Sequence, residues 1–295
     1  MTKKSGVRDL YDRRFYGADE EANFAEDANS NDTPQTRHPA YKLAFRDEDF
    51  LLLPELRPVR FQLELLKPEM LLDQAGVGST LVMYGSARIP SPEQVDALRE
   101  SAKGKSEAEQ KTVERLIEKA KYYQEAYNLA RMVTEKAIIE DGERQFVITT
   151  GGGPSIMEAG NRGASDAGGE SIGLNIVLPH EQAPNTFVTP YLSFQFHYFA
   201  LRKMHFLLRA KAVAVFPGGF GTFDEFFELL TLIQTGKMKP MPILLFGKDF
   251  WNRVIDFDAL AEEGTVSPRD IDLITWCETA DEAWAAIEEF YALKG

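Results

Sequence analysis

A glycine-rich turn at residues 217–225 constrains the fold of this chain more than any other feature. Its sequence is Pro-Gly-Gly-Phe-Gly-Thr-Phe-Asp-Glu. The apolar, β-branched run just before it, residues 212–216, is typical of a buried strand. Residues 226–233, just after it, carry apolar side chains at helical spacing. The motif therefore predicts a strand that turns directly into a helix.

The composition of this turn is that of an anion-binding site. Its glycines allow the backbone to approach a ligand closely, and the start of the next helix offers free amides and the positive end of its dipole. A phosphate suits such a turn best. The dinucleotide fingerprint is absent because Asp224 stands where a third glycine would be, and the chain has no P-loop motif.

A purely structural interpretation of the same residues stays open at this point. Thr222 and Glu225 have the S/T-x-x-E spacing of a capping box, in which the glutamate only closes the helix end. A second glycine cluster, Gly151-Gly152-Gly153, also follows a strand, and Ser155 and Glu158 repeat the capping spacing. Two such turns on one sheet can aim two amide-rich loops at one crevice.

Strand-like segments alternate with amphipathic helices through most of the chain. The expected strands are residues 80–84, 146–150, 172–179, 192–196, 212–216, 242–246 and 271–274. This alternation predicts an α/β fold, a doubly wound parallel sheet of the Rossmann-like kind with helices on both faces. Gly85 and Ser86 follow the first strand, and Gly152 and Gly153 follow the second. We expect all four at the carboxyl edge of the sheet, where such sheets bind ligands.

The expected organisation is one Rossmann-like nucleotide-binding catalytic domain, residues 76–295, preceded by an N-terminal extension, residues 1–75. Residues 17–33 are acidic and contain no lysine or arginine, which predicts partial disorder or a loosely docked arm. Residues 91–106 are polar and glycine-interrupted, typical of a loop or a poorly anchored helix.

Composition argues against several classes of partner. The net charge of −13 would repel a nucleic-acid backbone. The first residues lack the apolar core of a signal peptide and no apolar run is long enough to cross a membrane, so we expect a cytoplasmic protein without a membrane partner. The single cysteine, Cys277, excludes an intrachain disulfide. We expect no metal, because the histidines show no ligand spacing.

Two blocks of the sequence resemble the LOG family, the phosphoribohydrolases of cytokinin riboside 5′-monophosphates that are often labelled lysine decarboxylases. One block is residues 151–159, similar to a GGGPGIMEA string with Ser155 replacing a glycine. The other runs from Arg202-Lys203-Met204 through the PGGxGTxxE signature to Thr231. The resemblance covers residues 80–293 and is to the longer bacterial form.

This resemblance implies roles for individual residues. By position, the family's catalytic pair falls on Arg202 and Glu225. Its substrate-binding residues fall on the following positions: Gly85, Ser86, Gly152, Gly153, Glu181, Lys203, Gly219, Phe220, Gly221, Thr222 and Thr231. The opening turn, Tyr84-Gly85-Ser86, lacks the family's cysteine.

The implied function is hydrolysis of the N-glycosidic bond of a purine nucleoside 5′-monophosphate, either AMP or a cytokinin riboside 5′-monophosphate. The products are the free base and ribose 5-phosphate, and no cofactor is expected. The family also implies a homodimer or larger homo-oligomer. A non-catalytic nucleotide or molybdenum-cofactor carrier is the main alternative. A decarboxylase is a second one, which would need pyridoxal phosphate on a lysine, and Lys203 is the only lysine near the motifs.

Overall fold

The computed structural model describes residues 16–28, 32–178 and 183–293. The chain divides into two units, Met1–Gln62 and Leu63–Gly295. The boundary between these two units lies inside helix α4, Arg57–Gln74. Within the described ranges, no helix has the length and apolar character needed to cross a membrane.

The first unit is a succession of short helices. They are α1 (Ala18–Ala28), α2 (Pro34–Arg37), η1 (Pro39–Tyr41), η2 (Ala44–Arg46), α3 (Glu48–Leu51) and η3 (Pro54–Leu56). Helix α1 lies in the segment for which the sequence predicted partial disorder. Among the described residues of this unit only Ala22 is buried, so the unit has little apolar core of its own.

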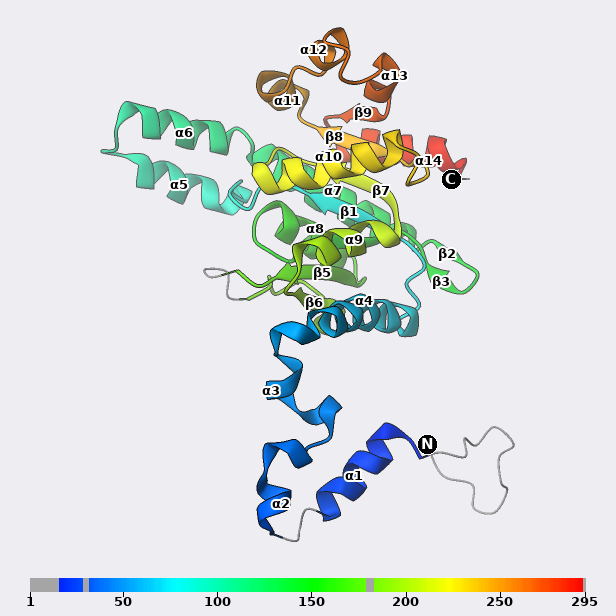
Figure 1. Cartoon of the computed structure of the whole chain (residues 1–295). Helices are drawn as coiled ribbons and strands as arrows, with labels where there is room; N and C mark the ends of the chain where they lie inside the picture. Colours follow the sequence, from blue (N-terminus) through cyan, green and yellow to red (C-terminus); the bar gives the residue numbers. More distant parts are fainter. Residues whose placement is uncertain (1–15, 29–31, 179–182, 294–295) are drawn as a thin grey trace. The chain divides into compact units, whose positions relative to one another are not determined.

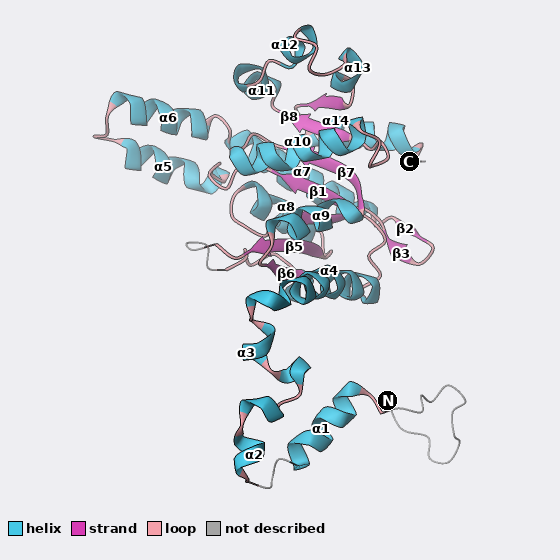
Figure 2. Ribbon diagram, in the orientation of Figure 1, coloured by secondary structure: helices cyan, strands magenta, loops and turns pink. Residues whose placement is uncertain are grey.

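The second unit is built on a parallel sheet of seven strands in the order β6-β5-β4-β1-β7-β8-β9 (Figures 1 and 2). The strands are β1 (Thr80–Tyr84), β4 (Val147–Thr150), β5 (Ser171–Ile176), β6 (Ser193–Phe196), β7 (Ala210–Val215), β8 (Ile243–Phe246) and β9 (Ile274–Cys277). Strand β1 is central, with Leu81 opposite Ile148 of β4 and Ala212 of β7. The predicted doubly wound parallel fold is confirmed.

Helices cover both faces of the sheet, because strands buried on both sides need an apolar layer on each. One layer consists of α7 (Ala120–Lys136), α8 (Ile156–Asp166) and α14 (Ala280–Tyr291). The other consists of α4, α9 (Phe199–Leu208), α10 (Phe220–Gln234), α11 (Lys248–Val254) and α12 (Phe257–Glu262). The sheet and its two helical layers form the core of this unit.

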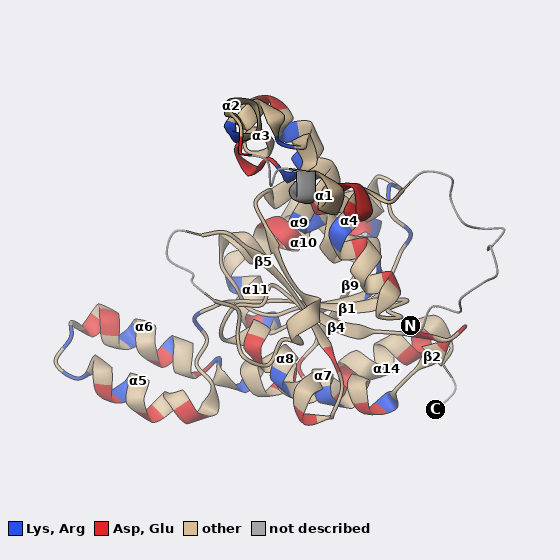
Figure 3. Cartoon of the chain, turned by 90° about the horizontal axis from the view of Figure 1, so that it is seen from below, with Lys and Arg blue, Asp and Glu red and all other residues tan. Residues whose placement is uncertain are grey.

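The remaining elements lie outside these layers. They are the hairpin β2 (Ile139–Glu140) and β3 (Glu143–Arg144), helix α13 (Pro268–Ile271), and the short η4 (Pro92–Gln94) and η5 (Pro190–Leu192). Helices α5 (Val95–Ala102) and α6 (Glu107–Ile117) form an inserted pair after β1. Residues of both charge signs occur along that pair (Figure 3), and Arg99 of α5 forms an ion pair with Glu114 of α6. Of the two alternatives for residues 91–106, loop or helix, the structure shows a helix at 95–102.

Candidate active site

The candidate site lies where the order of the strands reverses. From β1 the chain proceeds to β4, β5 and β6 on one side, and then returns to β7 on the other side of β1. The loops after β1 and β7 therefore separate, and open α/β sheets bind ligands at such a point. The loops that contain Gly85, Gly152 and Gly219 all follow strands at this carboxyl edge.

The turn after β7 exposes the start of α10. Gly219 is the N-cap, and an added Cβ at Gly219 or Gly221 would meet no atom within 4 Å. Gly218, in contrast, has no room for a side chain, because a Cβ there would lie 2.2 Å from the Thr222 hydroxyl. The side chain of Phe220 is 97% exposed. The positions of Gly219, Phe220 and Gly221 are thus open, and the first amides of a helix have no partner within the helix, as an anion site requires.

Neither predicted capping box forms. Helix α10 begins at Phe220, so Thr222 and Glu225 lie inside the helix and no side chain caps it. At α8 the N-cap Ser155 has φ +65° and donates its hydroxyl to the carbonyl of Ile89 at 2.6 Å. Glu158 instead accepts a hydrogen bond from the Tyr123 hydroxyl at 3.0 Å. The capping interpretation is therefore wrong for both glutamates, and Glu225 has no structural duty at the helix end.

The two residues with implied catalytic roles, Arg202 and Glu225, form a buried pair. Nη1 of Arg202 on α9 lies 3.4 Å from Oε1 of Glu225 on α10, and the side chains are only 11% and 14% exposed. Nε of Arg202 donates to the carbonyl of Leu174 in β5 at 2.6 Å. Its guanidinium also lies over the ring of Phe206, 5.1 Å from the centroid. Three elements thus fix the arginine, and the pair brings cation and carboxylate together at the crevice.

Burial is the largest influence on the Glu225 carboxyl. It raises the pKa of Glu225 to about 7, against the opposing effect of Arg202, with Asp224 adding to the increase. Burial, followed by the charge of Glu225, also raises the pKa of Tyr84 well above its ordinary value. Tyr84 ends β1, so a neutral phenol lies near the carboxylate. A carboxyl with this pKa exchanges its proton near neutral pH.

Lys203 joins α9 to α10. Its ammonium lies 3.0 Å from Asp224 and 2.9 Å from Glu228. Burial would lower the pKa of Lys203, but the hydrogen bonds to Glu228 and Asp224 outweigh it and raise the pKa above its ordinary value. This lysine is a charged cross-link between the helices that carry Arg202 and Glu225.

The loop after β4 lies directly against the arginine. A Cβ at Gly151 would come within 2.5 Å of Nη2 of Arg202, so a glycine there leaves room for the guanidinium. Gly152 has φ +72°, and a Cβ on it would lie 2.2 Å from Oδ1 of Asn175. The carbonyls of Gly152 and Gly153 accept hydrogen bonds from Nδ2 of Asn185, at 3.1 and 3.0 Å.

A buried polar network behind this loop was not anticipated from the sequence. Oδ1 of Asn161, a fully buried residue of α8, accepts hydrogen bonds from the hydroxyl of Thr150 at 2.7 Å and from Nδ2 of Asn185 at 2.9 Å. The Thr150 hydroxyl in turn accepts the amide N–H of Gly152 at 2.9 Å. The only signal in the sequence was an asparagine inside a helix, where its propensity is poor.

The turn after β1 ties the two glycine loops together. The amide of Ser86 donates to the carbonyl of Pro217 at 3.1 Å, and the carbonyl of Ser86 accepts the amide of Ile156 at 3.4 Å. Gly85 packs so closely on Ile156 that a Cβ would clash with it. Ser86 therefore lies between the start of α8 and the loop that leads into α10.

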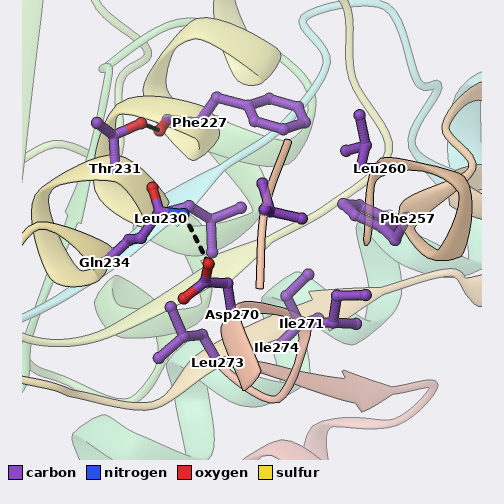
Figure 4. Close-up of a pocket in the computed structure, with 11 residues that line it drawn as sticks. Phe227, Leu230, Thr231, Gln234, Phe257, Leu260, Asp270, Ile271, Leu273 and Ile274 are labelled. Carbon is purple, nitrogen blue, oxygen red and sulfur yellow. Dashed lines mark hydrogen bonds between the residues drawn. The ribbon is translucent and has the colours of Figure 1, made fainter. Parts of the chain in front are cut away.

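Two predicted substrate contacts are not placed at this crevice. Glu181 lies outside the described residues. Thr231 is nine residues beyond Thr222 on α10, about 14 Å along the helix axis. Its hydroxyl donates to the carbonyl of Phe227 at 2.7 Å. Figure 4 shows Thr231 and Phe227 on a separate pocket of about 80 Å³ between α10, α12 and α13.

The described residues include no group of three or more His, Cys, Asp or Glu side chains that could hold a metal ion. What they do assemble is an amide-rich helix start, a buried arginine and a carboxyl of raised pKa. This arrangement can bind an anion and present a carboxylate beside it.

The fold is that of an α/β protein, and its candidate anion site lies at the switch point of the parallel sheet. A family model described as "Possible lysine decarboxylase" matches residues 157–287, a range that includes both Arg202 and Glu225. The chain is 28% identical, over 48% of its length and 65% of the relative's, to the cytokinin riboside 5′-monophosphate phosphoribohydrolase LOG3 of Arabidopsis thaliana. These matches confirm the resemblance to the LOG family.

Two further comparisons concern a rice relative and a solved structure. The chain is 27% identical to the probable cytokinin riboside 5′-monophosphate phosphoribohydrolase LOGL5 of Oryza sativa subsp. japonica, over 58% of this chain and 67% of the relative. The alignment with the Arabidopsis relative spans slightly less than two thirds of that protein. Among solved structures, the molybdenum cofactor binding protein of Rippkaea orientalis is similar with a TM-score of 0.41 and 18% identity, over 58% of this chain and 88% of that one.

Proposed function

We propose that this protein hydrolyses the N-glycosidic bond of a purine nucleoside 5′-monophosphate, AMP or a cytokinin riboside 5′-monophosphate, to the free base and ribose 5-phosphate. The observation that carries the proposal is the buried pair of Arg202 and Glu225 beside the open start of α10. The names of the curated relatives, which are phosphoribohydrolases, support the same reaction.

The geometry supports separate roles for the start of α10 and for Glu225. The amides of Gly219 to Thr222 bind the 5′-phosphate, since the helix start offers N–H donors and a positive dipole end. The ionised Glu225 then lies near the ribose. There it stabilises the oxocarbenium-like transition state or orients the attacking water. The water oxygen bonds to C1′ as the bond to the base breaks, the base leaves with that electron pair, and the proton that the water loses balances the proton that the base gains.

Arg202 supports this reaction in two ways. Its charge opposes the effect of burial on the pKa of Glu225 and so increases the ionised fraction of the carboxyl. A guanidinium also has donors for the phosphate or the ribose hydroxyls. Its position against Gly151 brings these donors to the same edge of the sheet as the glycine loops.

The residues fit a decarboxylase poorly, despite the description of the family model. A Schiff-base lysine reacts as a free amine, which requires a lowered pKa. Lys203 has a raised pKa and is held between Asp224 and Glu228. The structure therefore offers no support at Lys203 for pyridoxal phosphate.

The test is incubation of the full chain with AMP, a cytokinin riboside 5′-monophosphate, GMP, CMP and adenosine. Chromatography then measures free base and ribose 5-phosphate. Release of adenine or cytokinin from the monophosphates is the expected result. Binding of AMP without any release of base would favour the alternative, a nucleotide or molybdenum-cofactor carrier.

The proposal extends to partners and location. We propose a cytoplasmic homodimer or larger homo-oligomer that acts on a small molecule and binds neither nucleic acid nor membrane. The net charge of −13 supports the first of these exclusions, because it opposes binding to a polyphosphate backbone.

A further inference from the structure

Helix α9 carries Arg202 and Lys203, but its own sequence does not cap it. The N-cap residue is Tyr198, and its side chain makes no capping hydrogen bond. The amides of His197 and Tyr198 donate instead to Glu64 on α4, at 2.9 Å to Oε1 and 3.2 Å to Oε2. A carboxylate at this end also complements the positive end of the helix dipole. The cap thus comes from a residue 133 positions away from His197 in the chain.

The Glu64 cap reaches Arg202 through a single residue. The amide of Arg202 donates to the carbonyl of Tyr198 at 3.1 Å, and the amide of Tyr198 is the one that Oε2 of Glu64 accepts. The two hydrogen bonds belong to different peptide groups of Tyr198, so they are connected through the covalent backbone of that residue. The carbonyl of Leu174 in β5 accepts a hydrogen bond from Nε of the same arginine. The backbone of Arg202 is therefore fixed from α4 and its side chain from β5.

Helix α4 also holds the far end of α9. Nε2 of His205 lies 3.0 Å from the carbonyl oxygen of Glu64. Arg209, the C-cap of α9, pairs with Glu69 at 2.8 Å and with Asp73 at 2.5 Å. Helix α9 thus contacts α4 through its N-terminal cap, through His205 and through the ion pairs of Arg209. These contacts leave α9 little freedom to rotate or shift.

We propose that Glu64 is a positioning residue for the hydrolysis: its carboxylate holds the first turns of α9 in the orientation in which Arg202 meets Glu225. This inference rests on the proposed function, and it extends the active machinery to a helix outside every motif. It assigns Glu64 an indirect role, because no reacting group has to touch it.

The test compares the full-length wild type with Glu64→Ala, Glu64→Gln and Lys67→Ala. Lys67 is an exposed residue of the same helix and serves as the matched control. Rates are taken per folded molecule, with melting temperatures recorded alongside. We expect Glu64→Ala to lower kcat/KM roughly 10-fold to 100-fold, as small misplacements of catalytic groups do. Glu64→Gln keeps one carbonyl acceptor, so its kcat/KM should lie between those of Glu64→Ala and the wild type. Lys67→Ala should have the kcat/KM of the wild type.

Two further readouts separate positioning from general loosening. Arg202 lowers the pKa of Glu225, so a displaced arginine should move the rising limb of the pH–rate profile to higher pH in Glu64→Ala. Hydrogen exchange should quicken at the amides of His197 and Tyr198 and stay unchanged in Lys67→Ala.

The outcomes distinguish this inference from the proposed function. A wild-type protein that releases no base from any monophosphate would refute the function. If Glu64→Ala had the turnover of the wild type and the same rising limb of the pH–rate profile, the positioning role of Glu64 would be refuted. The proposed function would be unaffected by that result. A loss of rate without a shift of the limb would also refute it, because Arg202 would then have kept its place beside Glu225.

Discussion

At the scale of residues, Glu225 is placed where burial and charge act in opposite directions. Burial makes the charged form costly, whereas Arg202 at 3.4 Å stabilises it. The resulting pKa of about 7 divides the carboxyl between its two protonation states under physiological conditions. In the proposed reaction Glu225 must be ionised to stabilise a cationic sugar, so its pKa would set the fraction of the protein that is active.

Glu225→Gln should lower kcat by on the order of 100-fold or more, because it removes a charge that acts mainly on the transition state. In the wild type, kcat/KM should rise with pH through about 7, the pKa of Glu225. The measurement is a pH–rate profile from pH 5 to 9. The residual rate of Glu225→Gln should show no rise with pH near 7. Any remaining pH dependence should come from the phosphate of the substrate, which titrates near pH 6. A full wild-type rate in this variant would exclude Glu225 as the catalyst.

The same carboxyl should weaken the fold as the pH rises. Its pKa is near 4.5 in the unfolded chain and about 7 in the folded protein. Between these values the folded state binds more protons, so the free energy of unfolding falls with increasing pH. Denaturant titrations should show Glu225→Gln gaining stability relative to wild type, by on the order of 2 to 3 kcal/mol between pH 5 and 8. A difference that stays constant with pH would show that Glu225 is not buried as described.

At the scale of elements, the loop after β4 allows activity and stability to be separated at neighbouring glycines. A Cβ at Gly151 would press on Nη2 of Arg202 and on Sδ of Met157, both ends of flexible side chains. Gly151→Ala should therefore displace the arginine and lower kcat/KM roughly 10-fold or more, with a melting temperature close to wild type.

Gly152→Ala should lower the stability of the fold more than Gly151→Ala does. The backbone at this position has φ +72°, and the new Cβ would meet Asn175, which is itself hydrogen-bonded to Phe194. Strain of this kind costs about 1–3 kcal/mol, which should appear as a melting temperature several degrees lower. If thermal unfolding showed Gly151→Ala to be the less stable of the two, the packing described for this loop would be wrong.

The sequence predicted the elements that local chemistry determines and missed those that depend on distant contacts. The β1 prediction is confirmed to the residue. The last strand was predicted at 271–274 but lies at Ile274–Cys277. The shift arises because Ser267 and Asp270 form a capping box that draws Ile271 into α13. Whether Glu225 is a cap depends on a helix start at Phe220, which the S/T-x-x-E spacing could not reveal.

Other parts of the site were beyond local reasoning altogether. The cap that Glu64 provides and the network around Asn161 join segments far apart in the chain. No pattern within one segment predicts such pairs, because each residue alone resembles an ordinary surface or helix position. The same limit applies to Lys203, whose two acidic partners appear only when α9 and α10 pack together.

At the scale of the whole molecule, exposed apolar side chains bear on whether the chain assembles with further copies of itself. Helix α10 carries an excess of apolar side chains between Phe223 and Ile233. In the structure, Phe226 is fully buried and packs with Trp251 and Phe257 of α11 and α12. Part of the excess is thus covered within the chain. Residues 63–295 still expose large apolar side chains, and those on α4 and α9 include Leu63, Leu66, Met70, Met204 and Leu208.

We expect a second copy of the chain to cover such surface, since soluble monomers seldom leave extended apolar patches exposed. Light scattering during size exclusion at micromolar concentration should give a mass of about 66 kDa or more, at least twice the 33.2 kDa of one chain. A dilution series serves as the control, because a specific dimer dissociates at a defined concentration whereas nonspecific aggregates give no single mass. A mass of one chain throughout that series would contradict the prediction. The exposed leucines and methionines would then need no partner, and the site would have to be complete within a single chain.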